Sequence, residues 1–311
     1  MRVFREANFK FLSARRHAYV VSAAILGVGL IGLVARGGLQ AGVEFTGGAM
    51  VEVTFADVVE TANLRAALTG AGMEGVQIQQ LRGGGEGSEV LLRIPMEEGD
   101  ETQARAAVGG ALGATWAESD FEVVRSDALS SKVGSDFQRR AVLAVLISFV
   151  LTLFYLAFRF EWRFGVAAVI ATVHDILITF GFIAVAGIEM TLSTVAALLT
   201  IVGYSLNDTI VVFDRVRENL RKKRREEYRE TLDRSINETL PRTVLTSGTT
   251  MLALLSLAVL GGAVIRPLAL VLIAGVMVGT YSSIFVAAPA LLEIHDRARR
   301  AAARAAAHSA G

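Results

Sequence analysis

The stretch that decides the fold runs from Thr191 to Asn219 and reads TLSTVAALLTIVGYSLNDTIVVFDRVREN. Its apolar residues predict a helix that spans a membrane, and one carboxylate, Asp208, lies inside the apolar run. The run ends in charge at Asp214 and Arg215. A carboxylate at the centre of a membrane helix costs at least about 2.5 kcal/mol on insertion scales, so such residues normally face a partner or a water-filled path. Asp208 is therefore the first candidate functional residue, and we expect it to carry a proton across a membrane.

The composition of the chain is typical of an integral membrane protein. Its 311 residues are 53% hydrophobic and the mean hydropathy is +0.49, which is too apolar for an ordinary soluble domain. The absence of cysteine excludes disulfides, thiol catalysis and cysteine-ligated metal sites. The four histidines form no HExxH pair, and the sequence has no P-loop signature. We therefore expect no cofactor, no metal site and no bond-breaking enzyme chemistry.

Six apolar segments are long enough to cross a hydrocarbon core of about 30 Å at about 1.5 Å per residue. The first, 18–36, follows a basic leader, 1–17. We interpret it as an uncleaved span, because a signal peptide has a shorter apolar core and a small-residue cleavage site. The region 140–292 holds the other five spans, with a hydrophilic segment, 214–242, expected as a loop, and a tail follows at 293–311. The five later segments are 141–158, 164–188, 190–213, 243–265 and 267–292.

Residues 42–135 differ in character and predict a folded domain between the first and second spans. They carry fifteen Asp or Glu against six Lys or Arg. Strand and helix patterns alternate in the order β-α-β-β-α-β, which is typical of the α+β ferredoxin-like fold. The run Gly83–Gly87 is interpreted as a hairpin loop, because phosphate binding would need a following helix N-terminus. The elements are expected at 49–55, 58–68, 76–81, 89–94, 101–112 and 121–125.

The distribution of charge predicts an orientation. The leader, the short loop 159–163, the segment 214–242 and the tail are all basic and alternate to one side of the membrane. The positive-inside rule places that side in the cytoplasm. We therefore expect a multi-pass protein of the cell inner membrane, with both termini in the cytoplasm and the acidic domain outside. The basic run 221–225 is expected to contact membrane lipid rather than nucleic acid.

Three ionisable residues are candidates for a proton pathway. Asp175 lies twelve residues into the third segment, about 18 Å from its end and near the middle of the bilayer. Asp208 lies about 9 Å deep in the fourth segment. Arg242 stands at the start of the fifth segment, after Pro241, which suits a first helical turn. An arginine there can pair with Asp208 in one state and release it in another.

The resulting hypothesis is a switch in which charge pairing alternates with protonation. A buried carboxylate takes up a proton more readily unless a cation is near, so alternate pairing couples proton uptake and release to helix motion. Structural alternatives stay open for each residue: a polar anchor for Asp208, a bond to a neighbouring helix for Asp175 and His174, and interfacial snorkelling for Arg242. Polar residues that can hold water or bond between helices are Ser205, Asn207, Thr246 and Ser247.

Several motifs, taken together, resemble the SecD/SecF family of protein-export membrane proteins, and in particular its SecF members. One of them follows the first apolar segment and consists of Glu44, Phe45, Thr46, Gly47 and Gly48. The others are VHD at 173–175, GYSLNDTIVVFDRVREN at 203–219, RTVLTSGTT at 242–250 and GTYSS at 279–283. The matches run in order through nearly the whole chain.

The resemblance implies an α-helical polytopic membrane protein that forms one half of a resistance-nodulation-division-type transporter. It implies pairing with SecD, association with the SecYEG channel and the SecA motor, contact with YajC and YidC, and action on exported unfolded polypeptides. It implies that the proton motive force, or in some members sodium, helps to draw exported chains outward. By this resemblance Asp208 and Arg242 match the family's proton-pathway pair. Glu44 replaces the Asp that usually precedes Phe-Thr-Gly-Gly in the family, which leaves the role of this carboxylate open.

Two other functions are consistent with the same residues. One is a proton-driven half-size exporter of lipid or small molecules, and the other is a scaffold that braces a translocase. The outer domain, of about ninety residues, shows no obvious apolar ligand pocket in sequence, which favours polypeptide export over the first alternative. The coupling ion is expected to be H⁺, with Na⁺ left open because sites for both ions can use Asp with hydroxyl groups.

Overall fold

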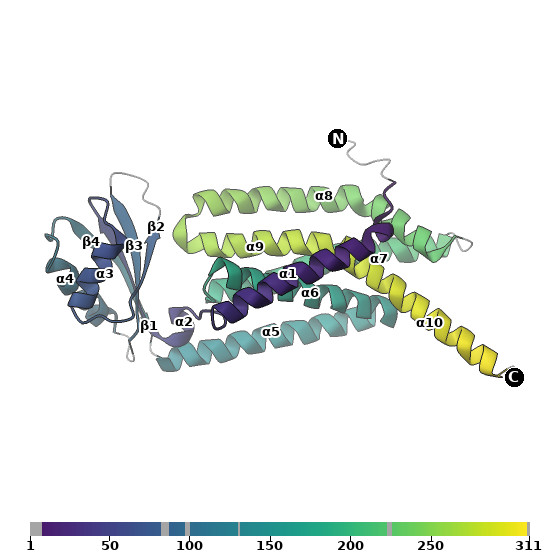
Figure 1. The fold of residues 1–311 in the computed structure, drawn as a ribbon, viewed down its shortest axis with the longest axis horizontal. Coiled ribbons are helices and arrows are strands. Elements are labelled where there is room, and N and C mark those ends of the chain that lie inside the picture. The colour runs from purple at the N-terminus through teal and green to yellow at the C-terminus, as the bar shows by residue number, and fades with distance from the viewer. Residues whose placement is uncertain (1–7, 82–86, 97–99, 130, 223–225, 310–311) are drawn as a thin grey trace.

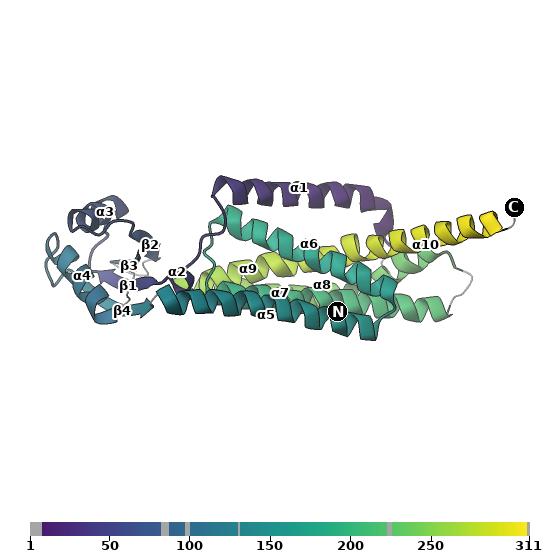
Figure 2. The same cartoon turned by 90° about the horizontal axis from the view of Figure 1, so that it is seen from below.

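The structure, a computed structural model, describes residues 8–81, 87–96, 100–129, 131–222 and 226–309. Figure 1 shows an elongated molecule in which a bundle of long helices carries a small α+β domain at one end. Figure 2 shows the C-terminal helix leaving the bundle at the end opposite this domain. The predicted fold class, a polytopic helical membrane protein with one α+β domain, is confirmed.

Six stretches of helix in the described ranges are long and apolar enough to cross a membrane. In the third and fourth of these, about half of the most apolar window is buried inside the protein, whereas in the second and fifth only 6% is buried. The outer helices therefore present their apolar side chains outward, as contact with lipid or another membrane helix requires. The helical elements of the bundle are η1 (Phe11–Ala14), α1 (Arg15–Ala35), α5 (Ser131–Arg159), α6 (Trp162–Ala186), α7 (Leu192–Lys222), α8 (Tyr228–Leu260), α9 (Gly262–Ser282), η2 (Ser283–Ala287) and α10 (Ala288–Ser309).

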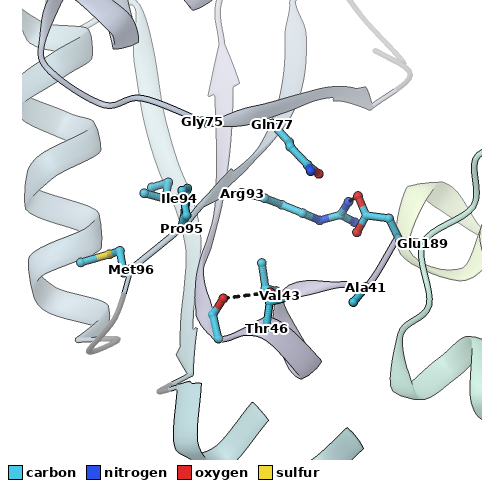
Figure 3. A pocket seen from close by; sticks show the side chains of 11 residues that line it. Ala41, Val43, Thr46, Gly75, Gln77, Arg93, Ile94, Pro95, Met96 and Glu189 are labelled. Atoms are coloured by element: carbon cyan, nitrogen blue, oxygen red, sulfur yellow. Dashed lines mark hydrogen bonds and ion pairs between the residues drawn. The ribbon is translucent and has the colours of Figure 1, made fainter. Parts of the chain in front are cut away.

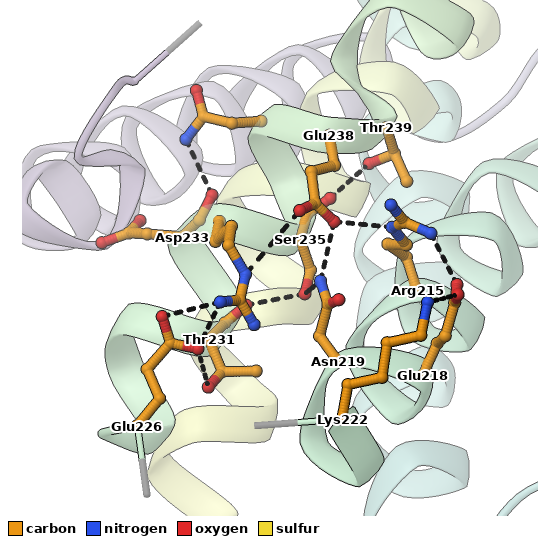
Figure 4. A network of polar contacts seen from close by, with 12 residues as sticks. Arg215, Glu218, Asn219, Lys222, Glu226, Thr231, Asp233, Ser235, Glu238 and Thr239 are labelled. Carbon is orange, nitrogen blue, oxygen red and sulfur yellow. Dashed lines mark hydrogen bonds and ion pairs between the residues drawn. The ribbon is translucent and has the colours of Figure 1, made fainter. Parts of the chain in front are cut away.

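The segment 214–242, expected as a loop, is mostly helical. Helix α7 continues to Lys222 and α8 begins at Tyr228, so the two helices extend beyond their apolar stretches as a hairpin. Polar pairs hold the two extensions together (Figure 4), and Arg215 bonds Glu238 across the hairpin at 2.6 Å. The expectation was wrong because hydropathy locates the end of an apolar stretch and not the end of a helix. The last three residues of the basic run 221–225 lie outside the described residues.

Pro241 lies inside α8 and does not form its first turn, because the helix begins thirteen residues earlier, at Tyr228. A proline inside a helix lacks the N–H that would bond the carbonyl four residues before it, here that of Asn237. The helix is therefore loosened directly before Arg242. The tail after Glu293 is also helical, as part of α10.

The α+β domain is a four-stranded antiparallel sheet in the order β2-β3-β1-β4, with two helices against one face. Alternate residues of β1 from Ala49 to Phe55 are buried against Leu64 of α3 and Val108 of α4. The element order confirms the predicted ferredoxin-like arrangement. The predicted hairpin loop Gly83–Gly87 falls mostly outside the described residues. The elements are β1 (Gly48–Phe55), α3 (Thr61–Gly70), β2 (Gln77–Leu81), β3 (Ser88–Ile94), α4 (Glu101–Gly113) and β4 (Phe121–Leu129).

Small residues let the helices of the bundle approach closely. A Cβ atom on Gly29 of α1 would lie only 2.7 Å from the Cα atom of Gly181 on α6. On α9, a Cβ atom on Gly275 would meet the side chain of Ile201, and one on Gly279 would lie 3.1 Å from the Cβ atom of Ser205. Since Ile201 and Ser205 both belong to α7, the glycine spacing on α9 sets how closely α7 packs against it.

The contact between α1 and α6 predicts a difference between two neighbouring glycines. Gly29→Val should lower the melting temperature of the detergent-solubilised protein, because overpacking a close contact costs about 1–3 kcal/mol. Gly27→Val is the matched control, since a Cβ atom added there meets no described atom within 4 Å. Equal melting-temperature shifts for the two variants would contradict the packing of α1 on α6.

Candidate functional site

Two carboxylates lie inside the bundle, one on each of its two central helices. Asp175 of α6 is 1% exposed and Asp208 of α7 is 3% exposed. Ser205 lies three residues before Asp208, so the two side chains lie on the same side of α7, about 4.5 Å apart along the helix axis. Because Ser205 bonds Asp175, both carboxylates border the same polar region between helices.

Asp175 is saturated with hydrogen-bond donors from neighbouring helices. Its Oδ2 atom accepts hydrogen bonds from Ser205 of α7 at 2.5 Å and from Ser282 of α9 at 2.6 Å. Its Oδ1 atom lies 2.8 Å from Nδ1 of His174, and Nε2 of the same ring lies 3.0 Å from the hydroxyl of Ser22 on α1. The His174–Asp175 pair therefore joins four helices, which agrees with the structural alternative of a bond to neighbouring helices.

The hydrogen bonds around His174 and Asp175 determine how many protons the two side chains share. The Tyr281 hydroxyl donates to the carbonyl of Ala18, so the Ser22 hydroxyl supplies the hydrogen for its contact with Tyr281. The contact between Ser22 and His174 then needs a hydrogen on Nε2 of His174, and a further one lies between Nδ1 and Asp175. With every contact made, the His174–Asp175 pair is neutral overall, which lowers the cost of burying it.

Asp208 has a different environment, because its Oδ2 atom is buried and bonds no described donor. Ser247 connects it to hydroxyl groups on α7 and α9. Ser247 of α8 interacts with the carboxylate, and its Oγ atom lies 2.7 Å from that of Thr280 on α9 and 3.3 Å from the hydroxyl of Tyr204 on α7. A buried acceptor without a partner costs about 1–3 kcal/mol. Of the two carboxylates, Asp208 is therefore the one with an oxygen atom available to a proton or another ligand.

Arg242 does not pair with Asp208 in this structure. The two interact electrostatically, but the Arg242 side chain is exposed and no ion pair joins them in the part of the chain that is described. The predicted pairing stays a prediction, and the structure shows the two residues apart. Of the supporting residues, Ser205 and Ser247 lie in the polar region, Thr246 is half-buried, and Asn207 is exposed on the opposite side of α7.

Four hydroxyl residues that sequence reasoning missed belong to this region: Ser22, Thr280, Tyr281 and Ser282. Directly after the last of them, the chain forms the π-helical turn η2. Such turns are rare and often occur at functional sites. The available signal was the run of hydroxyl residues inside the last apolar segment, which the GTYSS motif contains.

The motif at Glu44 lies at the junction between the bundle and the α+β domain. Its residues form most of the one-turn helix α2, Val43–Thr46, which precedes β1. The Glu44 carboxylate accepts a hydrogen bond from the backbone N–H of Leu192, the first residue of α7, with an N···Oε2 distance of 2.6 Å. A negative charge at a helix N-terminus is favourable, so the carboxylate caps α7 from a position 148 residues away in sequence.

The rest of the motif turns the chain from α2 into the sheet. Phe45 is buried, and the Thr46 hydroxyl donates to the carbonyls of Gly42 and Gly47. Gly47 and Gly48 have φ values of +78° and +128°, which glycine adopts readily. A Cβ atom on Gly48 would lie 2.5 Å from a carbonyl oxygen of β3. These two glycines are therefore required by backbone geometry.

A second link at the junction joins Arg93 of β3 to Glu189, in the turn between α6 and α7. The two side chains form a largely buried ion pair, and Figure 3 shows Arg93 reaching across the cleft toward Glu189. The Nε atom of Arg93 and the Oε2 atom of Glu189 are buried without a described partner. Burial raises the pKa of Glu189, while the Arg93 charge opposes that rise and Glu44 adds to it.

Comparison with known proteins identifies the family. Residues 111–297 match the family described as protein export membrane protein SecD/SecF, C-terminal. The chain belongs to the SecD/SecF family. It is 43% identical over 304 residues to the protein translocase subunit SecF of Gemmatimonas aurantiaca, which covers 96% of this chain and 90% of that relative.

Two solved structures of SecDF share the fold. The crystal structure of SecDF from Thermus thermophilus, described as a translocon-associated membrane protein, matches with a TM-score of 0.83 and 36% identity over 95% of this chain. A SecDF structure in a super-membrane-facing form matches with a TM-score of 0.67 and 37% identity over 96% of this chain. The chain spans only 40% of the length of either SecDF chain.

The neutral His174–Asp175 pair predicts a stability effect with a rescue. His174→Ala should destabilise the protein by about 3–5 kcal/mol, because it leaves a buried acid without its partner. The double variant His174→Ala, Asp175→Asn should recover part of the loss, since it also removes the charge. Thermal unfolding in detergent measures both, and a double variant no more stable than His174→Ala would contradict the pairing.

The raised pKa of Glu189 predicts a pH dependence of folding stability. The native protein holds this proton more tightly than the unfolded chain, where the pKa is about 4.3. The stability that Glu189 contributes is therefore present at low pH and is lost as the pH rises through the raised value. Glu189→Gln stays neutral, so the melting temperature of the wild type should approach that of the variant as the pH falls through the raised pKa toward that of the unfolded chain. Parallel melting curves across this range would contradict the burial of an ionisable group.

Proposed function

We propose that the chain is a SecF-type accessory subunit of protein export that works with SecD and uses the proton gradient across the inner membrane. Membership of the SecD/SecF family and the match to SecF over 90% of that relative's length support the transport role. The observation that carries the ionic part is the buried Oδ2 atom of Asp208, which bonds no donor among the described residues. A buried oxygen without a donor can take up a proton without breaking an existing hydrogen bond.

The proposed mechanism alternates the charge of Asp208. With Arg242 apart, the buried acid favours its protonated form. Movement of Arg242 toward Asp208 favours the carboxylate and releases the proton. Pro241 supports such movement, because the helix lacks one backbone hydrogen bond directly before Arg242. Asp175 holds its helices together through His174 and the two serines, and we assign it a role in supporting the site.

The exposed face of α7 supports SecD as the partner. Small and polar residues follow this face at helical spacing: Ser193, Ala196, Thr200, Gly203 and Asn207. Such a face lets a second helix approach closely in a membrane and gives Asn207 a group to bond. In SecDF one chain carries both parts, and this chain corresponds to 40% of it. A separate SecD chain would supply the remaining helices.

The wider assembly and the orientation are part of the same proposal. SecD and this chain would act beside the SecYEG channel after SecA, with YajC and YidC as further neighbours, on unfolded polypeptides that leave the membrane. The basic residues at the α7–α8 hairpin and on α10 support an orientation with that end of the bundle in the cytoplasm and the acidic α+β domain outside. H⁺ is the proposed coupling ion, and Na⁺ is the alternative.

The deciding experiment replaces Asp208 by asparagine in cells that lack the wild-type copy. Asp208→Asn should abolish gradient-dependent export while the complex with SecD still assembles, because the amide keeps the shape and removes the proton site. Export assays in proton and sodium gradients measure the loss and identify the ion. The matched control is Asp214→Asn, which removes a half-exposed carboxylate of the same helix that pairs with Arg159.

Normal gradient-dependent export by Asp208→Asn would defeat the proposal. Loss of assembly by that variant, with export and assembly falling together, would favour the scaffold.

A further inference from the structure

The first turn of α7 is held by groups from two parts of the chain. Thr191 and Thr194 cap each other, because the Thr194 N–H donates to the Thr191 hydroxyl at 3.1 Å and the Thr191 N–H lies 3.3 Å from the Thr194 hydroxyl. The N–H of Leu192 between them is taken by the Glu44 carboxylate of α2. Helix α7 thus depends on a side chain outside the helix to complete its N-terminus.

Helix α2 is attached on its other sides to the α+β domain and to α5. Only Gly47 separates it from β1. A Cβ atom on Gly134 of α5 would lie 2.8 Å from the carbonyl oxygen of Phe45, so α2 packs tightly on α5. Just before α2, the N–H of Gly42 donates to the carbonyl of Met190 at 2.8 Å. The short helix therefore lies between the sheet and the beginning of α7.

The α+β domain has a second support some distance from α2. Among the described residues, Arg93–Glu189 is the one ion pair that joins this domain to the bundle. A cleft of about 340 Å³ lies beside it and is lined by Val43 and Thr46 of α2 as well as by the ion pair (Figure 3). Because this cleft is not filled by side chains, no packed side chains there would resist a tilt of the domain once the ion pair opens.

We propose that Glu44 is a positioning residue that transmits a tilt of the α+β domain to α7, and through α7 to Asp208. Leu192 and Asp208 are sixteen residues apart on one continuous helix, so a shift of the first turn is carried about 24 Å to the acid. A carboxylate suits this role, because it bonds the N–H and interacts favourably with the helix dipole. The inference rests on the proposed function of Asp208 and adds how the outer domain acts on it.

The test measures two distances in the full chain reconstituted in lipid. The protein has no cysteine, so spin labels can be placed on introduced pairs without background. Gln79→Cys on β2 with Leu260→Cys at the end of α8 reports the tilt of the domain. Arg16→Cys on α1 with Lys222→Cys at the far end of α7 reports the position of α7. All four side chains are exposed.

Arg93→Gln opens the ion pair and leaves the Glu189 charge without its partner. Both distance distributions should then shift. When Glu44→Ala is added, the domain distance should still shift, but the α7 distance should return to its wild-type distribution. Glu44→Asp keeps a carboxylate and should keep the shift of α7. Arg125→Gln, which breaks an exposed ion pair within β4, is the matched control and should move neither distance.

An unchanged domain distance in Arg93→Gln overturns the proposal, and so does an α7 distance that still follows the domain after Glu44→Ala. Neither measurement needs an ion gradient or an exported chain. A failure of this coupling therefore leaves the effect of Asp208→Asn on export intact, and a failure of the proposed function leaves the coupling measurable.

Discussion

The bundle depends on how two acids are kept away from lipid. Asp175 and Asp208 are both almost fully buried, but they differ in their hydrogen-bond partners. Serines of α7 and α9 donate to Asp175, α1 contacts its partner His174, and the His174–Asp175 pair is neutral when all its contacts are made. Asp208 has an atom left unbonded by the described residues. The first acid joins the helices that surround it, and the proposed change of charge concerns the second.

Outside the membrane-spanning region, polar contacts lie at both ends of α7. At the hairpin of α7 and α8, several charged residues bond one another in a network, and Arg215 contributes to two ion pairs. At the opposite end, the α+β domain is joined through Glu44 and through the Arg93–Glu189 pair. Helix α7 thus runs from the junction with the domain, past both acids, to the hairpin.

Much of this arrangement was predictable from the sequence, and the omissions have physical reasons. The two acids could be identified because a charge in an apolar run is costly. The strands of the sheet could be predicted from their sequence patterns. Ser22 and Ser282 could not be assigned to the His174–Asp175 pair, because the sequence of one helix does not show which other helices pack against it. The hairpin was missed because its helices are stabilised by pairs such as Arg215–Glu238, which hydropathy does not detect. Glu44 was found by its motif, but its bond to Leu192 spans 148 residues and needed the fold.

The most direct measurement is infrared difference spectroscopy of the reconstituted protein during a change of pH. A protonated carboxyl group in an apolar site has a distinct C=O stretching band. The band should appear and disappear with pH in the wild type and should be absent from the difference spectrum of Asp208→Asn. A band that is retained unchanged in Asp208→Asn, or a wild-type protein with no such band, would contradict a cycling charge at Asp208.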